Sequence, residues 1–156
     1  MSIEKAREYL IKKGFDPARI IEFDTSSATV ELAAEALGCD PEHIAKSITF
    51  NVNGEPVMIL AAGDTKIDNP KYKAYFGTKA KMLTAAEVDE LIGHSVGGVC
   101  PFGVNEDVKV YLDESLKRFE TVYPACGSSN SCLKLTIAEL EELSGYCEWI
   151  DVCKIK

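Results

Sequence analysis

The dipeptide Asn53-Gly54 constrains the fold of this chain more than any other sequence feature. Asn-Gly is favoured in two-residue hairpin turns, because both positions of a type I′ turn need a positive φ. Before it, Ser47–Val52 alternates polar and apolar residues, as a half-buried strand does. After it, Pro56–Ala62 is almost continuously apolar, which is typical of a strand buried on both faces. The sequence therefore predicts a hairpin over residues 47–62 at the centre of a sheet.

Short capped helices and further strands surround this hairpin. Caps and glycine stops predict helices over residues 30–37, 69–76, 84–92 and 136–143. Strands are expected over residues 19–23, 108–112, 121–123, 132–135 and 148–155. Regular alternation of strand and helix, the mark of a doubly wound sheet, is missing. We therefore expect one α+β domain over residues 1–156, with a mixed, mostly antiparallel, barrel-like sheet flanked by helices. The sheet should have roughly six or seven strands.

Charge and hydropathy exclude several classes of protein. The chain has 25 acidic and 17 basic residues, which gives a net charge of −8. A protein with this charge is not expected to bind a polyanion over its whole surface. Only a local basic patch can contact nucleic acid. No apolar run approaches the roughly 20 residues that a membrane span needs. The polar N-terminal residues do not look like a signal peptide. We expect a cytoplasmic protein that binds neither membrane nor DNA.

The chain has six cysteines, and no two are spaced as Cys-x-x-Cys. Without an export signal, we expect reduced thiols that are mostly buried as small apolar side chains. The alternative is a metal site, to which only His43 and His94 can add imidazole ligands. We predict no metal and no cofactor.

Two segments are candidates for chemistry. Lys46 stands where a short helix meets the central strand, and it either points into a cleft as a cation or lies on the sheet edge as a surface lysine. The loop Gly97–Gly103 has two adjacent glycines, which allow close backbone approach, and a stiffening Pro101. Such a loop either binds an anion or carbonyl, with Phe102 as a stacking face, or is a tight turn. It contains no Walker motif.

One basic cluster stands out from the acidic background. Lys66, Lys71, Lys73, Lys79 and Lys81 are interleaved with aromatic residues. The cluster is either a local nucleic-acid contact or the solvated face of a helix. No nucleophile–base pair is evident from spacing alone.

The order of these segments resembles the YbaK family, also called the prolyl-tRNA synthetase-associated editing domain. The resemblance rests on the order of these segments: Thr29–Gly38 followed by Ile44–Ile48, the apolar strand with Gly63-Asp64, the loop Gly97–Gly103, and Cys126–Ser128 before Leu133–Leu135. It implies a small mixed-sheet domain that hydrolyses the ester of mischarged tRNA without a metal. Water attacks with help from a ribose hydroxyl of the tRNA, so the protein positions the substrate and stabilises the oxyanion.

The resemblance also implies site residues. Lys46 and the Gly-x-x-x-Pro loop, through Gly97, Gly98 and Pro101, are the expected catalytic residues. The expected substrate-binding residues are Thr29, Asp64, Val99, Cys100, Phe102, Gly103, Gly127 and Ser128. The basic cluster, and not the resemblance, supplies the expected tRNA-binding residues Lys66, Lys71 and Lys73.

Two functions follow as hypotheses. The first is a trans-editing aminoacyl-tRNA deacylase acting on tRNA for proline that carries alanine or cysteine, with prolyl-tRNA synthetase or an elongation factor as further partner. The second is a non-catalytic module that uses the same cleft to bind a nucleotide, a tRNA end or a partner. Turnover that depends on Lys46 separates the two.

Overall fold

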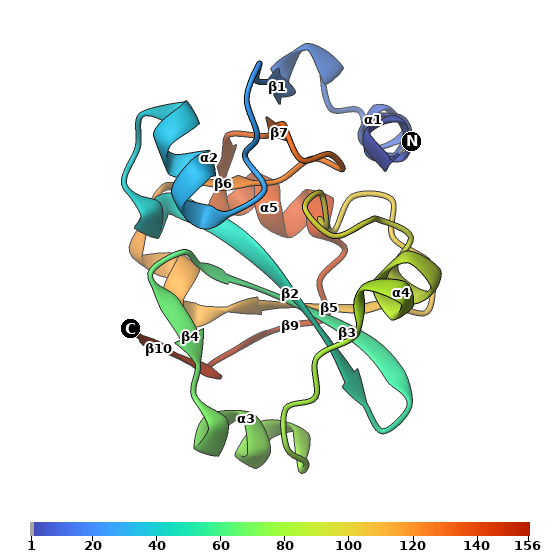
Figure 1. The fold of residues 1–156 in the computed structure, drawn as a ribbon, viewed down its shortest axis with the longest axis vertical. Helices are drawn as coiled ribbons and strands as arrows, with labels where there is room; N and C mark the ends of the chain where they lie inside the picture. The colour runs from blue at the N-terminus through green and yellow to red at the C-terminus, as the bar shows by residue number, and fades with distance from the viewer. Residues whose placement is uncertain (1) are drawn as a thin grey trace.

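The computed structural model describes residues 2–156 and is organised around one six-stranded sheet (Figure 1). Its centre is the predicted hairpin, formed by β2 (Ile44–Val52) and β3 (Glu55–Ala62). Asn53 and Gly54 adopt φ values of 51° and 89°, as the hairpin turn requires. The strand order is β8-β6-β2-β3-β5-β9, so the hairpin lies in the interior of the sheet, as predicted.

The six-stranded sheet contains both parallel and antiparallel pairings. β3 pairs with β5 and β5 with β9 in parallel, whereas β6 is parallel to β2 and antiparallel to β8. Two small antiparallel ladders, β1-β7 and β10-β4, extend the structure. Four of the seven ladders in the described chain are therefore antiparallel, and the predicted mixed α+β class is confirmed. The remaining strands are β1 (Ile21–Glu22), β4 (Thr65–Ile67), β5 (Lys109–Asp113), β6 (Thr121–Pro124), β7 (Ser131–Cys132), β8 (Leu135–Thr136), β9 (Glu148–Ile150) and β10 (Cys153–Ile155).

The helices begin where the sequence places cap residues. The Thr29 hydroxyl accepts a hydrogen bond from the Leu32 amide at 3.1 Å, and Thr84 and Thr136 each complete a capping box. The helices are α1 (Ser2–Lys12), η1 (Pro17–Arg19), α2 (Val30–Leu37), η2 (Pro41–His43), α3 (Asn69–Phe76), α4 (Ala85–Glu87), η3 (Val88–Ile92), η4 (Glu114–Arg118) and α5 (Ile137–Ser144). The short segment after α4 has π-helical hydrogen bonding.

Three strand predictions were wrong in extent. Residues 132–135 and 148–155 each divide into two strands that belong to different ladders. In the second case the chain changes sheet after Asp151, where the Val152 amide donates to the buried Asp113 carboxylate at 3.0 Å. At residues 19–23 only Ile21–Glu22 is extended, because Pro17 starts a 3-10 turn. β4 was not predicted.

The core lies on both faces of the central hairpin. Met58 and Leu60 face one hydrophobic cluster and Ile59 and Ala61 face the other, and all four are fully buried. Burying a large aliphatic side chain stabilises the fold by about 1.5–3 kcal/mol, so β3 contributes strongly to stability. All six cysteines are free thiols, as expected, and four are buried. No described helix is long and apolar enough to cross a membrane.

Candidate functional site

A pocket of about 460 Å³ lies along the edge of β2 that faces away from β3. On this side β2 pairs with β6 only at its first two residues, and the chain returns to it where the Leu83 amide donates to the Thr49 carbonyl at 3.2 Å. Between these contacts, residues 46–48 have no strand partner on this side within the described chain. Alternate residues of an antiparallel strand point their backbone groups to the same edge. The Ser47 amide and carbonyl therefore point toward the pocket.

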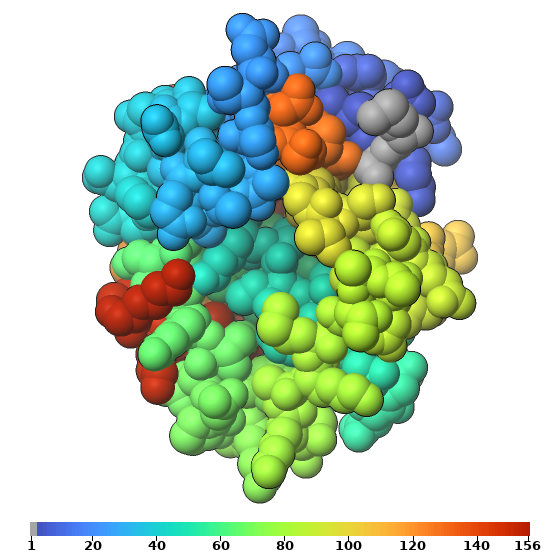
Figure 2. Space-filling model, in the orientation of Figure 1, coloured from blue at the N-terminus to red at the C-terminus, as the bar shows by residue number. Residues whose placement is uncertain are grey.

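Three of the segments that line this pocket are seen around its mouth. In Figure 2, the teal floor of β2 is visible between the blue-to-cyan segment that leads into α2, the yellow loop near residue 97, and the yellow-green segment before α4. Most of the lining is apolar, including the small residues Ala28, Ala33 and Ala125. Two exposed side chains, Met82 and Val96, stand at the rim, with 64% and 65% of their surface accessible. The pocket can therefore receive a ligand with an apolar part.

Lys46 lies in the wall of the pocket and is half-buried. Its ammonium group donates a hydrogen bond to the Thr65 carbonyl oxygen. Burial lowers the pKa of Lys46, and so does Lys156, while Cys153, Asp64 and Glu31 act in the opposite direction. The sequence left two alternatives, a lysine in a cleft or a surface lysine on the sheet edge; the structure favours the first, because Lys46 lines the pocket and is half-buried. A cation in this position can bind a phosphate or a polarised carbonyl oxygen.

The glycine-rich loop closes one side of the pocket. Gly97 and Val99 line it, and Gly97 has a φ of 96°, which favours glycine. A Cβ on Gly98 would lie 2.6 Å from the backbone of Gly127 and Ser128. This close approach joins the loop 97–103 to the loop 126–131, two segments that the sequence analysis singled out separately.

The other residues of this loop face the core. Cys100 and Phe102 are fully buried in the main hydrophobic cluster, Pro101 is buried, and none of them lines the pocket. The His94 ring is 2.6 Å from the Phe102 carbonyl oxygen and 3.6 Å from the Cys100 sulfur. Burial lowers the pKa of His94 and strongly raises that of Cys100. Gly103 packs against the backbone of Lys5.

The loop 126–131 contributes to the pocket only at its C-terminal end. Gly127 and Ser128 do not line the pocket, but Ser131 and Cys132 do. The Ser128 hydroxyl is 2.5 Å from the Ser131 hydroxyl and 3.0 Å from the Asn130 amide oxygen, so it orders the loop. Thr29 lines the pocket and caps α2 at the same time.

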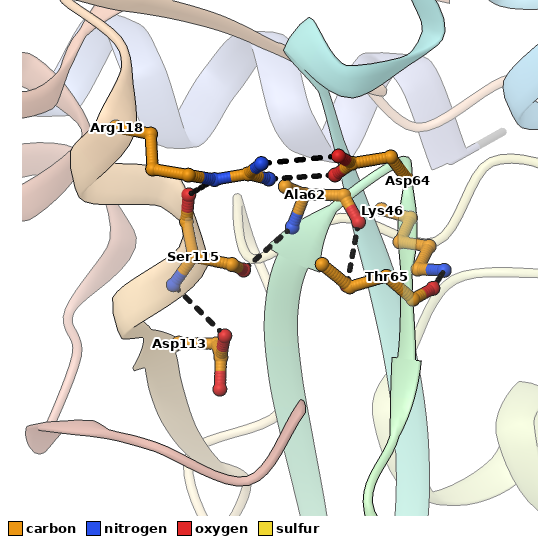
Figure 3. A network of polar contacts seen from close by, with 7 residues as sticks. All are labelled: Lys46, Ala62, Asp64, Thr65, Asp113, Ser115 and Arg118. Carbon is orange, nitrogen blue, oxygen red and sulfur yellow. Dashed lines mark hydrogen bonds and ion pairs between the residues drawn. The ribbon is translucent and has the colours of Figure 1, made fainter. Parts of the chain in front are cut away.

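Asp64 takes part in a contact that sequence reasoning missed. It forms a two-armed ion pair with Arg118, with N–O distances of 3.0 and 2.6 Å (Figure 3). Hydrogen bonds from Arg118 hold the pKa of Asp64 below its usual value. Arg118 lies 54 residues away in sequence, and no local signal identifies it.

The basic cluster is spread over β4, α3 and the segment after it. Lys71 is paired with Asp151 at 3.0 Å, so part of its charge is neutralised. Lys66 lies opposite Lys154 in the β4-β10 ladder, and both are exposed. Neither these two residues nor Lys73 lines the pocket. Lys154 was not part of the predicted cluster.

One group of residues has metal-ligand spacing within the part of the chain that the structure describes. Ligand atoms of Asp40, Glu42 and His43 all lie within 4.8 Å of one another. They lie outside the pocket, and the His43 ring packs on Phe119 with 4.4 Å between the ring centres. Solvated acidic groups of this kind are common, so the group does not by itself indicate a metal.

Two comparisons concern sequence. A family model described as an aminoacyl-tRNA editing domain matches residues 24–143. The chain is 58% identical over 136 residues to the uncharacterized protein YwhH of Bacillus subtilis strain 168, covering 86% of this chain and 87% of that protein. It is also 32% identical over 120 residues to a proline–tRNA ligase of Lactiplantibacillus plantarum, covering 74% of this chain but only 21% of the ligase.

A third comparison concerns structure. A solved protein described as a candidate trans-editing enzyme for prolyl tRNA synthetase superposes with a TM-score of 0.87 at 30% identity. The match covers 98% of this chain and 97% of that one. The family model and the solved structure therefore both indicate an aminoacyl-tRNA editing domain.

Proposed function

We infer the function from one premise, that this chain belongs to the aminoacyl-tRNA editing domain family. Members of this kind are aminoacyl-tRNA deacylases, and we propose that this protein acts in trans, without a metal, in the cytoplasm. The proposed substrate is tRNA for proline that carries alanine or cysteine in place of proline. The observation that carries the proposal is the half-buried Lys46 in the wall of an apolar pocket.

The pocket has the size and chemistry for the aminoacylated end of a tRNA. Its 460 Å³ falls within the roughly 300–1,000 Å³ typical of small-ligand sites. The apolar lining suits a small aliphatic or thiol side chain. The unpaired backbone edge at Ser47 offers a hydrogen-bond donor and an acceptor for the polar ester end.

Lys46 is proposed to hold the 3′ end and stabilise the oxyanion that develops when water attacks the ester carbonyl. A preorganised cation in a partly dry site stabilises such a charge better than solvent does. The expected attacking water is oriented by a ribose hydroxyl of the substrate, in keeping with the absence of any catalytic triad among the described pocket residues. Gly97 and Val99 position the substrate from the opposite wall.

Weak, local contact with the tRNA body is proposed for Lys66 and Lys73, which are exposed, and for Lys71. On a chain with a net charge of −8, a few lysines give only modest affinity. Prolyl-tRNA synthetase or an elongation factor is therefore a proposed partner that holds the rest of the tRNA.

The test is deacylation of tRNA for proline charged separately with alanine, cysteine, serine and proline. Wild type and Lys46→Ala are compared, with Lys109→Ala as matched control, because Lys109 is paired with Glu55 at 3.5 Å and does not line the pocket. Turnover of one non-cognate ester that is lost in Lys46→Ala and kept in Lys109→Ala supports the proposal. Saturable binding of the charged tRNA end without any turnover would instead support a non-catalytic binding module.

A further inference from the structure

We propose that Arg118 is a positioning residue for Lys46, acting through Asp64 and the turn between β3 and β4. The residues form a continuous set of polar contacts (Figure 3), and of its members only Lys46 lines the pocket. An effect of Arg118 on catalysis rests on the proposed function. Its effect on the position of the Lys46 side chain does not.

The first step is the ion pair that fixes Asp64 to η4. The Arg118 guanidinium donates to both Asp64 oxygens, and its Nε donates to the Ser115 carbonyl at 2.9 Å. It also stacks on Phe119, 4.7 Å from the ring centre. Two parallel N–H donors fix direction as well as distance, which a lysine ammonium cannot do. The Asp64 carboxylate is therefore held at a defined place.

The second step is the rigidity of the turn that carries Asp64. The Ala62 amide donates to the Ser115 hydroxyl at 3.1 Å, and the Ala62 carbonyl accepts from the Thr65 hydroxyl at 2.7 Å. A Cβ on Gly63 would lie 2.0 Å from the Pro41 carbonyl oxygen, so the turn is pressed against η2. Ser115 and Arg118 of η4 thus hold the turn on both sides of Gly63.

The third step is the hydrogen bond between the turn and Lys46. The residue after Asp64 is Thr65, whose carbonyl oxygen accepts the hydrogen bond from the Lys46 ammonium (Figure 3). On its other side Thr65 pairs with Ile155 in the β4-β10 ladder. A shift of the turn therefore moves the group that orients Lys46. Catalytic positioning is sensitive to displacements of about 1 Å, so a shift of this size reduces turnover.

The substitution Arg118→Met removes the guanidinium and keeps much of the aliphatic packing. Lys117→Met is the matched control, because Lys117 is the neighbouring cation of η4, pairs with Glu114 at 3.1 Å and does not contact the turn. Arg118→Lys keeps the charge without the two-armed geometry. It also provides a folded variant if Arg118→Met does not fold.

Two measurements are made on each variant. The first is NMR of the lysine ammonium groups in the full chain, with the Lys46 signal assigned by Lys46→Arg, and with the coupling from Lys46 Nζ to the Thr65 carbonyl carbon measured across the hydrogen bond. The second is deacylation of the mischarged tRNA. We expect Arg118→Met to lose the coupling and to lower kcat roughly 10-fold or more, with KM unchanged within about twofold. Arg118→Lys should fall between, and Lys117→Met should match wild type.

Persistence of the coupling in both folded Arg118 variants overturns the proposal. Equal losses in Lys117→Met and Arg118→Met also overturn it, since they indicate a general effect on the fold. If wild type deacylates none of the tested esters, the proposed function fails, yet the NMR measurement still decides whether Arg118 positions Lys46.

Discussion

Substituting Gly98 by alanine tests whether close contact between two loops builds the pocket. A Cβ at this position would lie 2.6 Å from the Gly127 carbonyl carbon and the Ser128 nitrogen, both of them backbone atoms. The loops would have to separate by about 0.8 Å, the difference between 2.6 Å and the 3.4 Å at which ordinary contact begins. Overpacking of this kind costs about 1–3 kcal/mol of stability.

The same shift displaces Gly97 and Val99 in the pocket wall, so we expect at least a roughly 10-fold loss of deacylation per folded molecule. Stability is measured by urea and thermal unfolding, where each kcal/mol lowers Tm by about 2–4 °C in a chain of this size. The control is Gly54→Ala at the tip of the hairpin, where no atom lies within 4 Å and φ is 89°. It should cost about 1 kcal/mol through backbone strain and leave deacylation unchanged. A Gly98→Ala protein as stable and active as wild type would refute the reasoning.

Three further predictions address charge. Hydrogen bonds from Arg19 are the main cause that lowers the pKa of Glu139 from its ordinary value of 4.5 to about 2. The pair therefore stabilises the fold fully above pH 4.5, and this stabilisation is lost as the pH falls toward 2. Glu139→Gln keeps the capping box, and urea unfolding should show a loss of about 1 kcal/mol at pH 7 and less at pH 3. Burial lowers the pKa of Lys46, so the charge of this lysine is less favourable in the folded than in the unfolded chain at neutral pH. Lys46→Met should raise the free energy of unfolding at pH 7, and chemical unfolding should show the gain shrinking as pH rises toward 10.5. Lys66 and Lys154 face each other as like charges, so replacing both by glutamine should stabilise the protein. In anisotropy titrations, the slope of log K against log salt concentration for tRNA binding should become shallower by about 1–2.

The parts of the fold that could be predicted are those set by neighbouring residues. The turn at Asn53-Gly54 and the caps at Thr29 and Thr136 act within four residues, and each stands where expected. The division of residues 148–155 into two strands depends on Asp113, whose carboxylate accepts a hydrogen bond from the Val152 amide, 39 residues away in sequence. No pattern within the segment contains that information.

The site follows the same rule. Lys46 and Gly97 were predicted from a resemblance that spans most of the chain, and both line the pocket. The rim residues Met82 and Val96 look like ordinary apolar residues in sequence, and only the fold exposes them. Arg118 is one of two basic residues in the last turn of η4, so only the position of the β3-β4 turn distinguishes it from Lys117.

The unpaired stretch of β2 also bears on how the protein avoids association with itself. An uncovered strand edge is a template on which another chain can add a strand and begin to aggregate. Here the gap is limited to residues 46–48, with β6 at one end and the Leu83–Thr49 contact at the other. An incoming strand would also meet the walls formed by α2 and the glycine-rich loop. The fold thus leaves backbone groups open to a small ligand while excluding a second polypeptide.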